Sequence, residues 1–347
     1  MKKFLAVITI VLALVVPAAV FTACGDDSKS SNDGSVTVLA SVSDVYKEIT
    51  GHDFPMAGLF VRGDVLENEP ALVAKIDARV ETSVENFNSD IDTVATKADN
   101  IKGFSLTAGV IKQAYTKMNV RYKDSADSKG DVTTLLTNIE AAVSDDLFAD
   151  VSGSAASAST DYTLYAPDGA PVLALADMWG EDFTYGTDGS ADITYAVTAE
   201  SNVSALMTSG EADFIVAPIN VGAQIHAGYK AGNMQYDYKL VNVTSWGVIY
   251  FTTNTDEYES RSEFADTVDG AKEFLSQFDG KTISTIGLAA IPGKTVQYLF
   301  EQADADVTVN GSDASTIQQS YIAKDPMTAI FAEPAITATN IRLTSGS

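Results

Sequence analysis

Cysteine and histidine are scarce in this chain of 347 residues, which has one cysteine, Cys24, and two histidines, His52 and His226. A single thiol excludes an internal disulfide and a metal site built from several cysteines. Two histidines provide little for a histidine-rich metal site or a catalytic triad. We therefore expect both histidines at the surface or in loops, and we predict no enzymatic activity, no cofactor and no metal.

Basic residues are also few. The chain has 22 lysines and arginines against 47 aspartates and glutamates, which gives a formal net charge of -25 at pH 7. Such an acidic protein is repelled by phosphate backbones, so we exclude nucleic acid as a partner. Hydrophobic residues make up 46% of the sequence, which at this length predicts a large core in two domains or in one bilobed unit.

Long apolar runs are confined to the N-terminus. Two lysines precede the apolar residues 4–16, and Pro17 then leads into small residues that end at Cys24. This order is typical of a secretory signal peptide, and the run is shorter than the roughly 20 apolar residues of a membrane-spanning helix. We therefore predict a signal peptide over residues 1–23 and a lipid on Cys24, as in a bacterial lipoprotein.

One position near the predicted lipidation site departs from the usual pattern. Phe21 stands three residues before the cysteine, where leucine is usual, so cleavage by the ordinary signal peptidase after Ala23, or no cleavage, stays open. Residues 24–34 are small and polar, and we predict that they form a flexible tether. The protein is then expected at the outer face of the bacterial cell membrane, anchored by the lipid.

The rest of the chain alternates short β-rich runs with helical stretches, which is the pattern of parallel sheets covered by helices. Strands are predicted over residues 57–62, 162–166, 193–197, 212–217, 238–243, 248–252, 282–286, 307–309 and 329–331. Helices are predicted over residues 171–179, 203–209, 222–227, 261–278 and 295–301, and long amphipathic ones over residues 68–97, 104–117 and 133–147. The fold class is therefore α/β, and the small residues 152–160 are predicted to be a linker.

Three loops with glycine and proline connect predicted strands to predicted helices, at residues 166–171, 217–222 and 287–295. In open α/β sheets the carboxyl ends of the strands form the crevice where ligands bind, and helix starts offer free backbone N–H groups. The three loops together predict a concave polar site, although each alone is equally an ordinary turn before a helix. The third loop lacks the glycine spacing of a nucleotide-binding P-loop.

Three side chains near strand ends are candidates for ligand contact. Trp246 follows a strand, where an indole is suited either to form a pocket wall or to pack at a hinge. Asp168 and Glu333 also follow strands. Two carboxylates suit general acid–base chemistry, but no nucleophile, metal or oxyanion site accompanies them, so we interpret them as hydrogen-bond acceptors for a ligand.

Five segments resemble, in the same order, a family of transport proteins. They are Tyr165-Ala166-Pro167-Asp168-Gly169-Ala170-Pro171, residues 210–223, residues 243–250, residues 279–287 and Ala332-Glu333-Pro334-Ala335. These segments are similar to ligand loops, to a strand that crosses between lobes and to the opening of the second lobe in the periplasmic-type binding proteins of ABC importers, in the taurine, nitrate, sulfonate and thiamine-precursor superfamily. The resemblance implies a bilobed, type II periplasmic-binding-protein-like fold whose two α/β lobes are joined by two hinge strands.

The order of one segment departs from this family. Residues 45–64 resemble a part that follows the Glu-Pro loop in the family, but in this chain they come first. We interpret this order as a circular permutation, since termini and exposed linkers tolerate such changes. The alternative is a duplicated or truncated chain that pairs with another copy.

The permuted order implies how the chain is divided into lobes. One lobe would contain residues 65–252, with the linker at residues 152–160 as the joint, and the other would combine residues 35–64 with residues 253–347. The hinge strands would cross near Tyr250 and Phe60.

The resemblance implies a monomeric protein that captures a small-molecule solute between its lobes and delivers it to an ABC permease of the cell membrane. The implied ligand-binding residues come from both lobes, and they are Asp168, Gly169, Ala170, Asn220, Val221, Trp246, Ala290, Ile291, Glu333 and Phe54. Because no arginine is among them, a neutral or weakly basic heterocycle such as a thiamine-precursor pyrimidine fits better than a sulfonate or nitrate. The alternatives are a non-transporting sensor or surface-interaction lipoprotein on the same fold and, less favoured, a pyrimidine-synthase-like enzyme.

Overall fold

The computed structural model describes residues 36–153, 160–185, 189–332 and 343–345. The predicted signal peptide, Cys24, the tether and Glu333 lie outside these residues, as does most of the predicted linker. Within the described ranges, no helix is long and apolar enough to cross a membrane.

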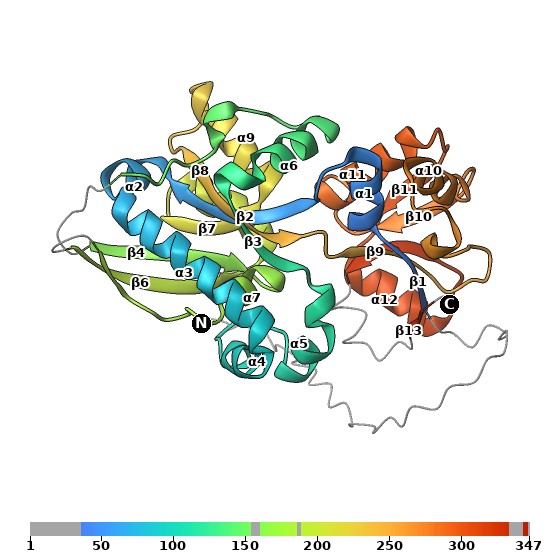
Figure 1. Cartoon of the computed structure of the whole chain (residues 1–347), viewed down its shortest axis with the longest axis horizontal. Helices are drawn as coiled ribbons and strands as arrows, with labels where there is room; N and C mark the ends of the chain where they lie inside the picture. Colours follow the sequence, from blue (N-terminus) through green and yellow to red (C-terminus); the bar gives the residue numbers. More distant parts are fainter. Residues whose placement is uncertain (1–35, 154–159, 186–188, 333–342, 346–347) are drawn as a thin grey trace, which may run out of the picture. The chain divides into compact units, whose positions relative to one another are not determined.

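A mixed sheet of seven strands forms one part of the fold (Figure 1). β4, β6, β7 and β8 run in one direction, whereas β2, β3 and β5 run in the opposite direction. The alternating pattern predicted parallel sheets, whereas this sheet is mixed, because β2, β3 and β5 run antiparallel to their neighbours. From one edge to the other the strands are β3 (Val120–Asp124), β8 (Tyr238–Trp246), β2 (Pro55–Arg62), β7 (Phe214–Pro218), β4 (Thr160–Pro167), β6 (Gly189–Thr198) and β5 (Phe183–Tyr185).

A second mixed sheet has six strands. Only β9 runs against the other five. In order, the strands are β11 (Thr308–Gly311), β10 (Thr282–Thr285), β12 (Thr328–Ala332), β9 (Ile249–Thr253), β1 (Val36–Ser41) and β13 (Leu343–Ser345). The α/β class predicted from the alternating pattern is confirmed.

Helices cover both faces of the seven-stranded sheet (Figure 1). One face carries α3 (Pro70–Ser89) and α7 (Ala170–Leu175), with α4 (Ile91–Asp99) and α5 (Ala108–Ala114) packed beside them. The other face carries α6 (Ser125–Asn138), α8 (Val203–Ser209) and α9 (Ile219–Lys230). α2 (Gly63–Asn68) directly follows β2.

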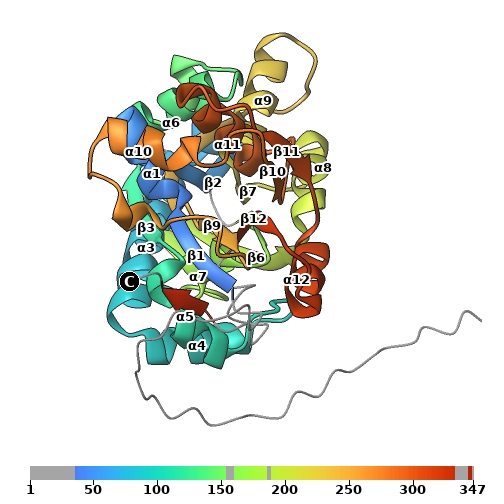
Figure 2. The same ribbon diagram turned by 90° about the vertical axis from the view of Figure 1, so that its right-hand side faces the viewer.

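The six-stranded sheet is also covered on both faces (Figure 2). Its apolar residues fall into two buried clusters, of which the smaller joins α12 to β1 and β12. One face carries α1 (Val42–Thr50), α10 (Val268–Ser276) and α11 (Ile291–Gln302), and the other carries α12 (Ala314–Ala323). Single 3₁₀ turns occur at Tyr115–Lys117, Asp145–Leu147, Glu200–Asn202 and Arg261–Glu263.

Capping residues explain why three long predicted helices have other bounds. The predicted helix over residues 68–97 is two helices, because the chain turns at Asp90 and this side chain accepts the N–H of Thr93 to start α4. Thr107 caps α5 in the same way, so that helix begins later than predicted. Asp124 caps α6, which therefore begins and ends earlier than the predicted helix over residues 133–147.

Aromatic rings fill the core beside β9. Phe251 lies with its ring centroid 5.6 Å from Phe274, 5.7 Å from Phe278 and 6.1 Å from Phe300. All four side chains are buried, and burying each one stabilises the fold by roughly 2 kcal/mol. The same buried cluster continues to Phe60 in β2, so one apolar core includes residues of both sheets.

The chain passes directly from one sheet to the other after β8. That strand ends at Trp246 and β9 begins at Ile249, so only Gly247 and Val248 connect the two sheets. The φ angle of Gly247 is +47°, and a Cβ atom there would lie 2.4 Å from the Cβ atom of Ser43. Only glycine fits this passage without rearrangement.

A second passage, at residues 51–54, leads from α1 beside the six-stranded sheet to β2 in the seven-stranded sheet. The chain therefore changes sheet at residues 51–54 and 247–248, whereas the lobe boundaries predicted from the sequence are at residues 64 and 252. Both predicted crossing strands lie within a single sheet, β2 in the seven-stranded one and β9 in the six-stranded one.

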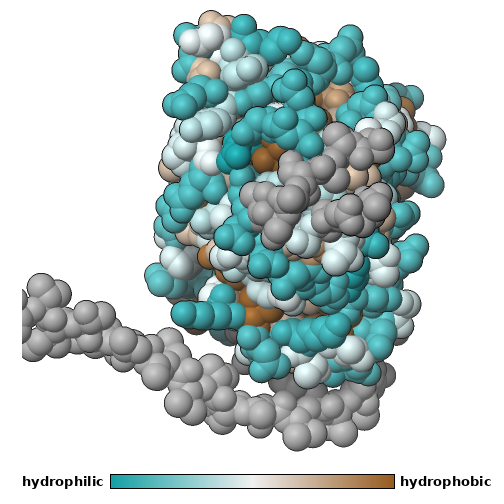
Figure 3. Space-filling model, turned by 90° about the vertical axis from the view of Figure 1, so that its left-hand side faces the viewer, coloured by the Kyte–Doolittle hydropathy of each residue, from teal (hydrophilic) through white to brown (hydrophobic). Residues whose placement is uncertain are grey.

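The surface drawn in Figure 3 is largely hydrophilic, with only small hydrophobic areas. This agrees with the large excess of acidic residues. Large apolar side chains with high exposure in the described ranges are few, namely Val143, Tyr229, Val268 and Ile322.

Candidate functional site

Four strands of the seven-stranded sheet end at the same side of it. Pro167 at the end of β4 pairs with Thr198 at the end of β6. Ala57 at the start of β2 pairs on one side with Pro218, the last residue of β7, and on the other with Ser245 near the end of β8. We call this side the carboxyl edge. Residues 168–170 of the predicted loop and the start of α9 follow it directly, whereas Trp246, predicted to follow a strand, is the last residue of β8.

The six-stranded sheet has a corresponding edge. β10 ends at Thr285, shortly before the predicted residues Ala290 and Ile291, and β12 ends at Ala332, next to Glu333. β9 begins at this side, because Ile249 pairs with Ala332. Both passages between the sheets therefore connect the carboxyl edge of one sheet to the corresponding edge of the other (Figure 1).

The loop after β4 holds three predicted residues. Asp168 is exposed, and its carboxylate accepts the backbone N–H of Ser105 at 3.0 Å. Gly169 has a φ of +107°, which L side chains rarely adopt, and a Cβ atom there would meet nothing within 4 Å. Ala170, partly buried, begins α7.

Asn220 and Val221 lie in the first turn of α9, and both are partly buried. The side-chain oxygen of Asn220 is buried and has no hydrogen-bond partner in the described part of the chain. On the six-stranded sheet, Ala290 precedes α11 and Ile291 begins it, with a side chain that is almost fully buried.

Trp246 is fully buried. Its indole N–H donates to the backbone oxygen of Arg121 at 3.0 Å. The guanidinium carbon of Arg121 and the ammonium of Lys123 lie 4.9 Å and 4.8 Å from the centre of a ring of this indole. Phe54 is equally buried, against Tyr46 with ring centroids 5.0 Å apart. In this conformation both aromatics pack at the passages, and direct ligand contact by either stays a prediction.

Asp53, in the passage at residues 51–54, is the centre of an ion-pair cluster that was not predicted from the sequence. Its carboxylate lies 2.8 Å from both Lys47 and Lys123 and 3.6 Å from Arg121. Burial acts to raise the pKa of Asp53, but hydrogen bonds from Lys123 and Lys47 and the charge of Arg121 lower this pKa well below its usual range. The signal in the sequence was the alternation of Arg121 and Lys123, which places both cations on one face of β3.

Asp131 of α6 extends this cluster. It accepts from Lys123 at 2.8 Å, and a ring nitrogen of His52 lies 3.2 Å from its other oxygen. The cations beside Trp246 are thus already paired with carboxylates. A bound anion would have to compete with Asp53 and Asp131 for them.

The opposite side of the seven-stranded sheet, where β7 and β8 begin, is called here the amino edge. Arg62, the last residue of β2, pairs at this edge with Asp64 at 2.6 Å and with Asp213 at 2.8 Å. His226 of α9 is fully buried, so the expectation of a surface position was wrong for this histidine. Its two ring nitrogens lie 2.6 Å from Asp237 and 3.0 Å from Asp146.

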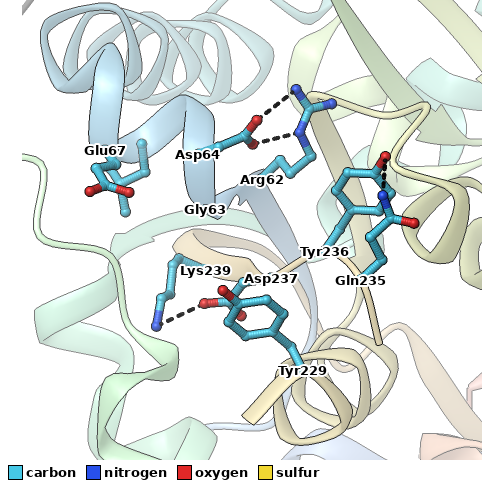
Figure 4. A pocket seen from close by; sticks show the side chains of 10 residues that line it. Arg62, Gly63, Asp64, Glu67, Tyr229, Gln235, Tyr236, Asp237 and Lys239 are labelled. Carbon is cyan, nitrogen blue, oxygen red and sulfur yellow. Dashed lines mark hydrogen bonds and ion pairs between the residues drawn. The ribbon is translucent and has the colours of Figure 1, made fainter. Parts of the chain in front are cut away.

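Two surface cavities of about 540 and 510 Å³ are lined by other residues than those predicted. The first lies at the amino edge, and Figure 4 shows that its charged side chains already bond to one another, as Arg62 does to Asp64 and Lys239 to Asp237. The second is formed by α4 and the end of α7, around Asp177.

Comparisons with protein-family models, with curated proteins and with solved structures found no match for this chain. Within the described residues, no group of three or more His, Cys, Asp or Glu side chains is arranged to hold a metal ion. The candidate site is therefore assigned from geometry alone, at the carboxyl edges of the two sheets.

Proposed function

We propose that this protein is an extracytoplasmic solute-binding lipoprotein, which captures a small molecule between two α/β lobes and delivers it to an ABC importer. The observation that carries the proposal is the connection of the two carboxyl edges by both passages of the chain. Ligands of open α/β sheets bind outside the carboxyl ends of strands. A protein that joins two such edges is suited to contact one ligand from both sides.

The proposed mechanism is closure without chemistry. A solute that contacts both edges only when they are close together shifts the population towards the closed arrangement. The short passage at Gly247 and Val248 is the proposed hinge, because only these two residues connect β8 of one sheet to β9 of the other. The glycine allows a backbone conformation that other residues resist.

The position of the N-terminal strands supports the proposed circular permutation. β1 lies beside β9 in the six-stranded sheet, and β2 lies between β7 and β8 in the seven-stranded sheet. The segment that comes first in the chain thus supplies one strand to each sheet, as the family's C-terminal part would after such a rearrangement. Under this proposal the tether after Cys24 enters the lobe of the six-stranded sheet.

The charges at the carboxyl edge favour an uncharged or weakly basic solute, such as a thiamine-precursor pyrimidine. Lys123 is paired with Asp53 and Asp131, and Arg121 lies 3.6 Å from Asp53, so a sulfonate or nitrate would have to compete with these carboxylates. His226 does not support an enzyme that consumes its own histidine, because it is buried at the amino edge between two carboxylates.

Native mass spectrometry of the purified chain tests the proposal, together with a thermal-shift screen of heterocycles. A true solute at about 100 times its Kd stabilises the protein by about 2.7 kcal/mol, which a thermal melt detects. Taurine and nitrate serve as charged comparison compounds. If nothing copurifies and no compound raises the melting temperature, solute binding is refuted.

A further inference from the structure

Five buried side-chain atoms have no hydrogen-bond partner within the described ranges, and four of them belong to the segments that follow or form the carboxyl edges. These four are the side-chain oxygens of Asn220, Thr244, Ser245 and Thr295. A buried polar group that lacks a partner costs about 1–3 kcal/mol, so folded proteins rarely keep one without a reason. Because four of the five atoms are at the carboxyl edges, these polar groups are candidates for ligand binding.

Three of these groups lie together on the seven-stranded sheet. Ser245 and Pro218 are both cross-strand neighbours of Ala57, and Asn220 follows Pro218 by two residues. Since neighbouring strands are about 4.8 Å apart, Ser245 and Pro218 are about 10 Å apart across β2. Thr244 and Ser245 are 0% and 3% exposed, and they lie three and two residues before Gly247, where the passage begins.

We infer that Thr244, Ser245 and Asn220 are the polar contacts of the solute, and that this solute is uncharged and carries both hydrogen-bond donors and acceptors. The inference rests on the proposed function. Hydroxyl groups both donate and accept, and the free oxygen of Asn220 accepts. None of the three groups carries a charge, and the nearby cations are paired with Asp53 and Asp131.

The burial of these atoms sets a condition on binding. All three oxygens are covered in the described conformation, so a solute reaches them only after the covering residues move. Hinge bending at Gly247, two residues after Ser245, supplies such a movement. Binding then replaces three missing hydrogen bonds, which makes the bound state more favourable than the covered one.

The experiment uses the full-length chain and the variants Ser245→Ala and Thr244→Val. Thr252→Val is the matched control, because the Thr252 hydroxyl is equally buried but bonds to Tyr321 at 2.7 Å and to the backbone of Ala329 at 2.9 Å. Cytosine and nicotinamide are the uncharged probes, and taurine and nitrate are the charged ones. Stability is measured by urea unfolding and affinity by calorimetric titration.

We expect Ser245→Ala and Thr244→Val to unfold at the same urea concentration as the parent chain, or a higher one, while Thr252→Val unfolds at a lower one. For the tighter uncharged probe, each of the first two variants should raise Kd about three- to tenfold, the effect of losing one hydrogen bond. Thr252→Val should leave Kd within about twofold.

Several results would overturn the inference. If the probe binds but both variants keep the parental Kd, the contacts are elsewhere, although solute binding itself stands. If Ser245→Ala and Thr244→Val lose as much stability as the control, their hydroxyls are already bonded in the free protein. Binding of taurine or nitrate in place of the uncharged probes, or of no probe, refutes the solute class, and the copurified molecule then decides the function separately.

Discussion

At the amino edge of the seven-stranded sheet, buried and half-buried ionisable side chains are paired with one another, as His226 is with Asp237 and Arg62 with Asp213. At the carboxyl edge of the same sheet, the buried polar side chains of Thr244 and Ser245 are uncharged and have no partner among the described residues. The two edges belong to one sheet and are separated only by the length of its strands. Paired charges also occur at the carboxyl edge, around Asp53. Among the described residues of this sheet, however, only the carboxyl edge has buried hydroxyl groups without a partner.

This difference separates stability from function. In a paired network at one edge, each polar group has a partner. Removing one member leaves its partner buried and unpaired, which costs free energy. Unpartnered groups at the other edge destabilise the folded state and are available to a ligand. Variants at the first edge should therefore reduce stability, and variants at the second should reduce binding.

The largest expected effect is at His226. Replacing it with alanine leaves Asp237 buried without its closest partner, and we expect the free energy of unfolding to fall by about 3 kcal/mol. Burial acts to raise the pKa of Asp237, but the hydrogen bond and charge of His226 and the nearby Lys239 lower this pKa, so the carboxylate stays ionised. Urea unfolding at neutral pH measures the loss.

His52 provides the matched control, because its side chain is 41% exposed and contacts one carboxylate, Asp131, whereas that of His226 is 1% exposed and contacts two. His52→Ala should change stability much less. Equal losses of unfolding free energy in the two variants would show that the buried pairing of His226 stabilises the protein no more than the exposed pairing of His52.

A smaller effect is expected at Asp177, in a third paired cluster beneath α3. Burial acts to raise its pKa, but hydrogen bonds from Lys97, Asn86 and Arg79 lower this pKa from the ordinary value of 3.8 to about 2. The side chain is 9% exposed, so the interactions are only weakly screened. Because the folded state holds this proton less tightly than the unfolded state, pairing stabilises the protein above about pH 4.

This contribution disappears as the pH falls from about 4 to about 2, and it amounts to about 2 kcal/mol. Unfolding measured between pH 6 and pH 2 should show Asp177→Asn losing less stability on acidification than the parent chain. The difference between the two proteins isolates this group from the other carboxylates. Parallel pH profiles would mean that Asp177 is not stabilised by its partners.

The sequence revealed the α/β alternation and most strand positions, because β-rich runs between turns are local features. It did not reveal the direction of β2, whose pairing partners in β7 and β8 are more than 150 residues away in the chain. It also missed β3 and α12, since Val120–Asp124 carries three charged residues among five and Ala314–Ala323 has few apolar residues to mark one face.

The loops of the candidate site were predicted from the sequence, but the burial and the hydrogen-bond partners of its side chains were not. Asp168 and Asn220 were placed after strands correctly, and strand order then brings them to one edge. The burial of Trp246 under Arg121 and Lys123 was not predictable, because those cations lie on a strand that the sequence did not reveal. Whether a polar group is paired depends on tertiary contacts, which composition and spacing do not contain.

The smallest expected effect extends the comparison to the six-stranded sheet. Thr295, one turn into α11, is fully buried and its hydroxyl has no partner in the described part of the chain. Thr295→Val removes that hydroxyl while keeping the shape, so we expect the free energy of unfolding to stay within about 0.5 kcal/mol of the parent or to rise. Tyr321→Phe, which removes a buried hydroxyl bonded to Thr252, should instead lose about 1 kcal/mol. Urea unfolding of both variants distinguishes them, and a loss at Thr295 as large as that at Tyr321 would show that the carboxyl edge of this sheet satisfies its own polar groups after all.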